Sequence, residues 1–187
     1  MCPDCSKASS SRRLHLLGRK KDMIPEIKKI LFATDLSKNS AYAFYYAIHM
    51  AKRDEAKIVV LHAVDPLPPM LITFEDFVFK VAKDRWDDAN KKFNERLLEF
   101  HKKVDARMGI SSVELVSKKL IRLGHPVEEI LKVVDEEACD VIVLGTHGKG
   151  FLEQTFLGSV SSSLLLRTRK PVFLVPLPSE DISEDLI

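Results

Sequence analysis

The sequence has no uninterrupted run of about 18 apolar residues, the length that a membrane-spanning helix requires. Within residues 1–22 the only apolar stretch, Leu14 to Leu17, is interrupted by His15 and is too short for the core of a signal peptide. We therefore expect a soluble, cytoplasmic protein that has no membrane partner.

Cysteine is also scarce, with three residues in a chain of 187. Cys139 lies in an apolar segment, whereas Cys2 and Cys5 form a single Cys-x-x-Cys pair. A zinc ribbon needs two such pairs, or one pair completed by nearby histidines, so this pair is a weak signal for metal or redox chemistry. A plainer interpretation is a disordered extension or a start codon placed too early, because Met23 opens the first patterned segment.

The charge of the chain is unevenly distributed. Residues 1–22 hold six basic and two acidic side chains, a net charge of +4, so the other residues carry −2 of the formal +2. The net negative charge of residues 23–187 does not favour binding to a polyanion, so we expect no nucleic-acid partner. Only the N-terminal tail could serve as a basic arm. We divide the chain into this basic tail at 1–22, one domain at 23–178 and an acidic C-terminal tail at 179–187.

From Met23 onward, strand-like and helix-like segments alternate. Five apolar segments are typical of buried strands, and the third alternates in a way that favours a place near a sheet edge. They lie at 27–35, 56–64, 113–121, 139–145 and 171–176. Helical patterns lie between them: one at 41–51, a long one at 74–108 closed by Gly109, one that opens at Pro126 and one from about Ser159. This order predicts an α/β fold, an open five-stranded parallel sheet with helices on both faces.

Glycine is rare as well, but four of the seven glycines fall within residues 145–159, between the fourth strand and the last helix. In a parallel sheet, ligands bind beyond the carboxyl ends of the strands. One or two of these glycines could simply allow a tight turn. However, Gly158 and Ser159 open a helix, and a helix N-terminus with exposed N–H groups is a site for anions, most often phosphate. The glycine segment therefore predicts a phosphate site.

Two common phosphate loops are excluded by their spacing. A Walker A loop needs Gly-Lys-Ser/Thr, but Gly150 is followed by Phe151; the dinucleotide motif needs a third glycine that is absent after Gly150. The pattern that fits is G-x2-G-x9-G-[ST], filled by Gly145, Gly148, Gly158 and Ser159.

With this motif the chain closely resembles the universal stress protein family, in its ATP-binding branch. The resemblance extends over residues 24–176 and includes KKILFATDLSKNSAYAFYYAIHMA, IVVLHAV, DVIVLGTHG, GSVS and KPVFLVP. It implies a Rossmann-like sheet of the adenine nucleotide alpha hydrolase type, with the strand order 3-2-1-4-5. Family members commonly form homodimers by pairing their last strands, which correspond here to residues 172–175.

The resemblance also implies the roles of individual residues. Asp35 would contact the ribose or the region of a phosphate-bound metal, and Thr34 would line the nucleotide. Ala63 and Val64 would offer backbone groups and an apolar wall to the adenine. The ribose and phosphates would be held by Gly145, Thr146, His147 and Gly148, and the phosphate tail by Gly158, Ser159, Val160 and Ser161. The ligand is expected to be ATP, with AMP or ADP left open, accompanied by Mg or Mn.

Each of these side chains also has an ordinary structural explanation. Asp35 could cap the first helix, and His147 could make a structural hydrogen bond in its loop. His62, inside an apolar strand, is expected to be a hydrogen-bonded core residue rather than a ligand. Lys149 could neutralise phosphate charge or be solvated. Arg167 lies near a helix C-terminus, where the helix dipole alone favours a cation.

Three functions are consistent with the sequence. The first is an ATP-binding, dimeric regulatory module of the stress response with slow or no ATP hydrolysis. The second is a nucleotidyl transferase or hydrolase of related fold, but the H-I-G-H and S-G-G-x-D-S signatures are absent and no catalytic residue is assigned. His147 and Glu153 are the only loop candidates for handling a water molecule. The third is a dimeric interaction module that works without nucleotide.

Overall fold

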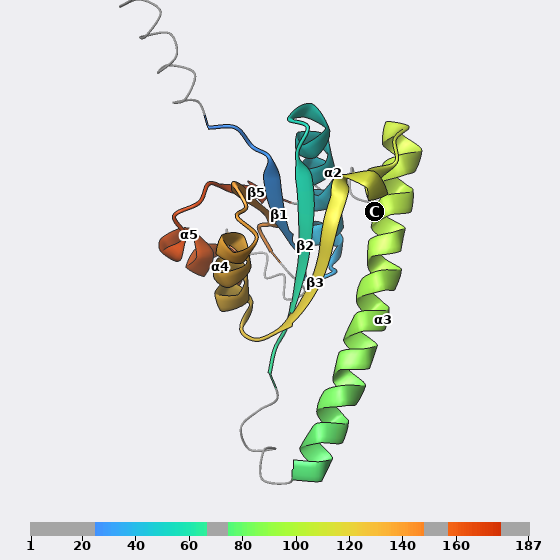
Figure 1. Cartoon of the computed structure of the whole chain (residues 1–187), viewed down its shortest axis with the longest axis vertical. Helices are drawn as coiled ribbons and strands as arrows, with labels where there is room; N and C mark the ends of the chain where they lie inside the picture. The colour runs from blue at the N-terminus through green and yellow to red at the C-terminus, as the bar shows by residue number, and fades with distance from the viewer. Residues whose placement is uncertain (1–24, 67–74, 148–156, 177–187) are drawn as a thin grey trace, which may run out of the picture.

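The computed structural model of the chain describes residues 25–66, 75–147 and 157–176, which form one α/β unit (Figure 1). Its centre is a parallel sheet in the order β3-β2-β1-β4-β5. The strands are β1 (Lys29–Ala33), β2 (Lys57–Val64), β3 (Val116–Leu123), β4 (Val141–Gly145) and β5 (Val172–Val175). The predicted fold class and strand order are confirmed.

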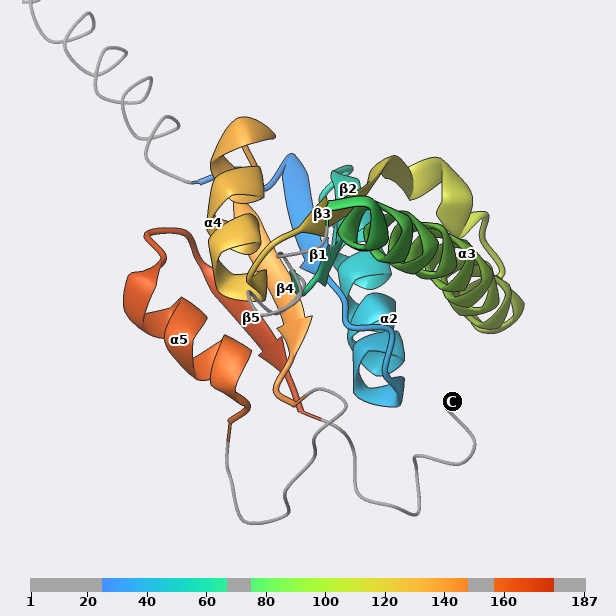
Figure 2. The same cartoon turned by 90° about the horizontal axis from the view of Figure 1, so that it is seen from below.

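Helices cover both faces of the sheet (Figure 2). One face carries α2 (Lys38–Arg53) and α3 (Glu75–Met108), and the other carries α4 (Pro126–Glu136) and α5 (Ser159–Arg167). The central strands β1, β2 and β4 are nearly continuous in buried apolar residues because both of their faces are covered. Alternate side chains of these strands enter two separate core clusters, one under each helical layer.

Helix α2 begins where its sequence predicts. Ser37 has extended backbone angles, and its side chain accepts a hydrogen bond from the N–H of Ser40, as an N-cap residue does. The apolar face expected from the three- and four-residue spacing is buried against the sheet, from Ala41 to Ala51. This cap fixes the start of α2 at the carboxyl end of β1.

Helix α3 is continuous for 34 residues. Its second half packs on the sheet through Phe93, Leu97, Phe100 and Val104. Its first half extends beyond the carboxyl edge of the strands (Figure 1), and residues 83–88 are all exposed. The helix ends at Met108 and is followed by Gly109, whose φ of 60° is less strained for glycine than for other residues.

The third strand differs from its expected range. We predicted a strand at 113–121, but Ser112–Leu115 form a short 3-10 helix and the strand runs from Val116 to Leu123. The cause is a pair of contacts with α3: the N–H of Ser112 donates to Asp105 Oδ1, and Ser112 Oγ lies 2.7 Å from His101 Nδ1, so the chain is held in a turn on this helix. The strand lies at a sheet edge, as its alternating pattern indicated.

Candidate functional site

A cavity of about 310 Å³ lies at the carboxyl edge of the sheet. It opens between the ends of β1 and β4, which are hydrogen-bonded neighbours although β2 and β3 come between them in the sequence. From β1 the chain adds strands on one side of the sheet, and from β4 it adds β5 on the other. The cavity therefore lies where the strand order reverses, the usual ligand position in open α/β sheets.

The end of β1 forms one wall of the cavity through Thr34 and Asp35. The Asp35 carboxylate accepts a hydrogen bond from the N–H of Ser37, and Thr34 Oγ1 accepts from the N–H of Leu36 and from the Ser40 hydroxyl. Leu36 between them has a φ of 66°, so the chain turns sharply here. Asp35 thus stabilises the turn that leads into α2 and also lines the cavity.

The end of β4 is fixed by its backbone carbonyls. The carbonyl of Gly145 accepts from Ser161 Oγ at 3.0 Å, and that of Thr146 accepts from the N–H of Gly158 at 2.8 Å. The carbonyl of His147 accepts from Asn39 Nδ2 at 2.6 Å. The N–H of Thr146 in turn donates to Val175 in β5. Three consecutive residues are therefore held by α2, α5 and β5 together.

Helix α5 points its N-terminus at the cavity, and Gly158 is its N-cap residue. The first helical hydrogen bond runs from the N–H of Ser162 to the carbonyl of Gly158, so the N–H groups of Ser159, Val160 and Ser161 have no acceptor within the helix. Gly158 has a φ of −66°, which any residue can adopt. The absence of a side chain at Gly158 therefore leaves space at the helix start rather than allowing an unusual backbone.

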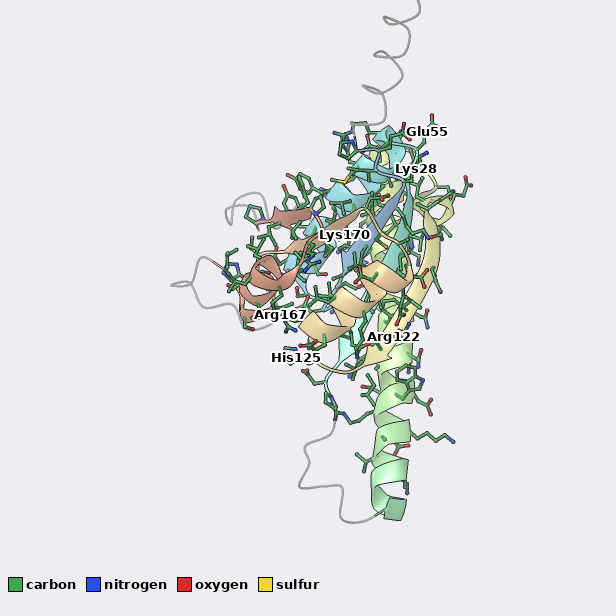
Figure 3. All side chains as sticks on the ribbon, turned by 60° about the vertical axis from the view of Figure 1, so that its left-hand side comes forward. Lys28, Glu55, Arg122, His125, Arg167 and Lys170 are labelled. Atoms are coloured by element: carbon green, nitrogen blue, oxygen red, sulfur yellow. The ribbon has the colours of Figure 1, made fainter. Side chains whose placement is uncertain are left out.

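Helix α4 provides an apolar wall through Pro126 and Ile130. Pro126 occupies the first turn, as its position in the sequence predicts. An ion pair of 2.6 Å between Arg167 and Glu128 links the end of α5 to the first turn of α4. Figure 3 labels Arg167 at the end of α5 and His125 just before α4. The two helices that flank the cavity on this face are thus joined to each other.

Comparisons with known proteins show the family to which the chain belongs. The family profile described as the universal stress protein family matches residues 26–176. This chain belongs to the universal stress protein family. The universal stress protein MJ0531 of Methanocaldococcus jannaschii is 31% identical over 154 residues, which cover 82% of this chain and 85% of that protein.

A second universal stress protein of the same organism, MJ0577, is 28% identical over 152 residues, covering 79% of this chain and 94% of MJ0577. Its solved structure superposes with a TM-score of 0.67 at 25% identity, over 83% of this chain and 100% of that one. A universal stress protein solved in complex with cAMP gives a TM-score of 0.53 at 19% identity, over 81% of this chain and 98% of that chain. This last likeness shows the shared fold.

Most of the residues that the sequence singled out lie together in this universal stress protein. The cavity lining includes Thr34, Asp35, Ala63, Gly145, Thr146, His147, Gly158, Ser159, Val160 and Ser161. Val64 is not in the lining; its carbonyl accepts a hydrogen bond from the N–H of Gly124. Gly148, Lys149 and Glu153 lie outside the described residues. His62 is buried, and its Nδ1 lies 2.7 Å from the carbonyl oxygen of Thr34, as expected of a core histidine.

The sequence reasoning missed six residues of the lining, which are Ala33, Ser40, Leu61, Pro126, Ile130 and Leu144. It also missed Asn39, which holds the carbonyl of His147 from behind the cavity. Ser40 and Asn39 were within reach of prediction, because both lie in the first turn of the helix that follows β1. The start of such a helix lies at the same sheet edge as the end of its strand.

In the described part of the chain, none of the helices is both long and apolar enough to cross a membrane. Among those same residues, no three His, Cys, Asp or Glu side chains come together as metal ligands. The Cys2 and Cys5 pair falls outside the described residues.

Proposed function

We propose that this universal stress protein binds an adenine nucleotide in the cavity between β1 and β4. ATP is the ligand expected first, with ADP and AMP as alternatives. The bound nucleotide would set the state of a dimeric regulatory module in the stress response, and hydrolysis would be slow or absent. The single observation that carries this proposal is a cavity with an apolar wall on one side and a helix N-terminus on the other.

The apolar wall suits a base. Leu61, Ala63, Pro126 and Ile130 line the cavity and come from β2 and α4. A flat purine ring buries apolar area against such side chains, while backbone groups at the strand ends can satisfy its edge. A volume of about 310 Å³ is at the lower end of the range of roughly 300–1,000 Å³ that small-molecule pockets have, which suits a nucleoside monophosphate. A longer phosphate chain would continue past the exposed Ser159.

The opposite side suits phosphate. Three N–H groups at the start of α5 lack acceptors within the helix, the helix dipole favours an anion there, and the Ser159 hydroxyl is exposed. No Lys or Arg side chain is among the described residues that line the cavity, whereas Asp35 is. Because phosphates and a carboxylate repel each other, we expect a polyphosphate to arrive with Mg or Mn, held mainly by phosphate oxygens and water.

One known universal stress protein has been solved in complex with cAMP, which is an adenine nucleotide. That protein is 19% identical, so its likeness supports the fold and leaves the ligand argument to the cavity itself. For hydrolysis, His147 is the described loop candidate, and its Nδ1 lies 3.0 Å from Thr146 Oγ1. This contact gives His147 a hydrogen-bond partner in its own loop, and we assign it no catalytic role.

The dimer is proposed from β5. This strand ends the sheet at one edge, and an unpaired apolar edge strand invites a second strand. Phe173 is 39% exposed and packs against Tyr46 of α2 with ring centroids 5.8 Å apart. Pairing of two β5 strands about a two-fold axis would cover this edge and bury the exposed rings.

The proposal is tested by calorimetric titration of ATP with Mg into nucleotide-free protein. Gly158→Glu places a carboxylate at the start of α5, and we expect a loss of affinity of at least about tenfold, equivalent to about 1.4 kcal/mol. Leu98→Glu is the matched control, because Leu98 is exposed on α3, on the other face of the sheet.

Three outcomes decide between the alternatives. Saturable binding by the wild type and by Leu98→Glu, with loss in Gly158→Glu, supports the proposal. Equal binding by all three proteins places the site elsewhere. Absence of binding by the wild type favours an interaction module that works without nucleotide, and rapid release of phosphate or pyrophosphate during the titration favours a hydrolase or nucleotidyl transferase.

A further inference from the structure

Asn39 lies in the first turn of α2 and is almost completely buried, with 6% of its surface exposed. Its side-chain Nδ2 donates to the carbonyl oxygen of His147, at a distance of 2.6 Å. The two residues are 108 positions apart in the sequence, so the bond joins the start of α2 to the end of β4. Asn39 itself is not among the residues that line the cavity.

The same carboxamide explains why residue 145 is a glycine. A Cβ added at Gly145 would lie 3.0 Å from both Cγ and Nδ2 of Asn39. Gly145 is outside the left-handed backbone region, so its conformation does not require glycine. The space at Gly145 is therefore occupied by the Asn39 side chain and is not simply a place for ligand phosphates.

The carboxamide oxygen of Asn39 differs from its NH2 group in hydrogen bonding. Asn39 Oδ1 is buried and has no hydrogen-bond partner among the described residues. A buried acceptor without a partner destabilises a fold, so a smaller apolar residue here would avoid that cost. The side chain is consistent with a requirement for its N–H donor, which is bonded to the carbonyl oxygen of His147.

The bond from Asn39 holds the segment after β4 on the side that faces α2. Ser161 and Gly158 of α5 hold the carbonyls of Gly145 and Thr146, whereas the described hydrogen bond to the next carbonyl, of His147, comes from α2. Without the Asn39 donor, residue 147 could shift relative to the β1 end, where Asp35 lies. Both strand ends line the one cavity, so such a shift would change its shape.

We infer that Asn39 is a positioning residue for the nucleotide site: through the His147 carbonyl and the space at Gly145, it fixes the β4 end and thereby sets affinity without touching the ligand. This inference rests on the proposed function. According to this inference, a residue of α2, the helix that follows β1, affects nucleotide affinity through the position of the β4 end. It also divides the motif glycines into one that accommodates a protein side chain, Gly145, and one that leaves space at a helix start, Gly158.

The test uses Asn39→Asp and Asn39→Ala. Aspartate keeps the shape of the side chain and suits the positive end of the α2 dipole, but it lacks the N–H donor. Alanine removes the side chain altogether. The matched control is Asn94→Ala, because Asn94 Nδ2 also donates to a backbone carbonyl, that of Asn90, on the exposed surface of α3. For each protein, the Kd of ATP with Mg is measured by calorimetry at 25 °C and the stability by thermal unfolding.

We expect both Asn39 variants to bind at least about tenfold more weakly than the wild type and Asn94→Ala to bind equally. A purely structural role would lower the unfolding temperature and leave the Kd unchanged well below that temperature, which would overturn the inference. As a second variant pair, Gly145→Ala should weaken binding on its own, but should cost much less in the Asn39→Ala background, where the space is free. Additive losses would contradict the shared space.

A measurement without nucleotide separates this inference from the proposed function. In amide NMR spectra of the free protein, Asn39→Asp should shift the resonances of Thr146, His147 and Ser161. If the wild type binds nucleotide and the Asn39 variants bind it equally, the inference fails alone. If the wild type binds none, the proposed function fails and the affinity claim with it, whereas the NMR shifts still decide whether Asn39 fixes the β4 end.

Discussion

The backbone N–H of Gly158 donates to the carbonyl oxygen of Thr146 at 2.8 Å. This bond joins the start of α5 to the end of β4, so the two halves of the glycine motif meet at one point although twelve positions separate the bonded residues. It also separates two classes of group at the site. Some polar groups, such as this N–H and carbonyl, bond α5 to the end of β4. Others, the N–H groups in the first turn of α5, have no acceptor within that helix and lie at the cavity.

Ser159 and Ser161 represent these two classes on one helix. Ser159 is exposed at the start of α5, whereas Ser161 Oγ is buried and donates to the carbonyls of Gly145 and Thr146. We expect Ser159→Ala to weaken ATP binding with little change in stability. Ser161→Ala should lower the free energy of unfolding by about 1–2 kcal/mol, because it leaves buried carbonyls with fewer donors. Calorimetric titration and urea denaturation of both variants check this division; the reverse pattern would contradict it.

Gly145→Ala tests the tight contact behind β4. The new Cβ would lie 3.0 Å from the Asn39 carboxamide, closer than such contacts normally come. We expect a loss of about 1–3 kcal/mol in the free energy of unfolding, as for other overpacked buried sites. Urea denaturation measures it, with Ser163→Ala on α5 as a substitution outside this contact. A stability equal to that of the wild type would mean that Asn39 moves aside without cost.

Much of this architecture followed from local patterns in the sequence. Long apolar runs such as Lys57–Val64 predict strands covered on both faces, and Pro126 marks a helix start, since both effects depend only on neighbouring residues. The strand order and the residues assigned to the site came from the resemblance, and most of those residues line one cavity. Their contact with a nucleotide stays a prediction.

The missed features depend on contacts between distant segments. Nothing near Asn39 in the sequence indicates that its amide reaches His147. Ser161 was expected beside the phosphates and does line the cavity, but nothing near it in the sequence indicates that its hydroxyl also donates to the carbonyls of Gly145 and Thr146. The start of the third strand was misplaced for a similar reason. Ser112 is held by His101 and Asp105 of α3, which overrides the strand pattern of the residues that follow it.

His101 should make the stability depend on pH. It is 2% exposed, and burial lowers the pKa of its imidazole, with Lys119 acting in the same direction and Asp105 opposing. Its Nδ1 lies against Ser112, and its ring meets Phe44 edge-on. Because the lowered pKa means that the folded state prefers the neutral ring, this contribution is present above the unfolded value of about 6.5 and is lost as the pH falls below it.

The measurement is urea denaturation of the wild type and His101→Gln between pH 8 and about pH 5. We expect the wild type to lose stability on acidification more steeply than the variant. His49→Gln is the control, because His49 is exposed on α2, and it should follow the wild type. Parallel curves of stability against pH for all three proteins would show that the pKa of His101 does not differ between the folded and unfolded states.

The proposed dimer makes a separate prediction at β5. Val172 and Leu174 pack against the core under α4 and α5, so a charge there would weaken the fold as well as any interface. Phe173, which is 39% exposed, is the cleaner position. Light scattering should give twice the chain mass of 21.2 kDa for the wild type and a monomer for Phe173→Glu. Leu123→Glu, on the opposite sheet edge, should remain a dimer; a dimer in Phe173→Glu counts against this interface.

The most direct test of the central claim is a titration of ATP with Mg into the isotopically labelled wild-type protein, followed by amide NMR. If the cavity between β1 and β4 holds the nucleotide, the amide resonances of Ser159, Val160 and Ser161 shift and saturate together with those at the β1 end, while the resonances of the exposed residues 83–88 of α3 stay in place. If no amide at these positions shifts, or the saturable shifts lie elsewhere, nucleotide binding at the glycine motif is contradicted.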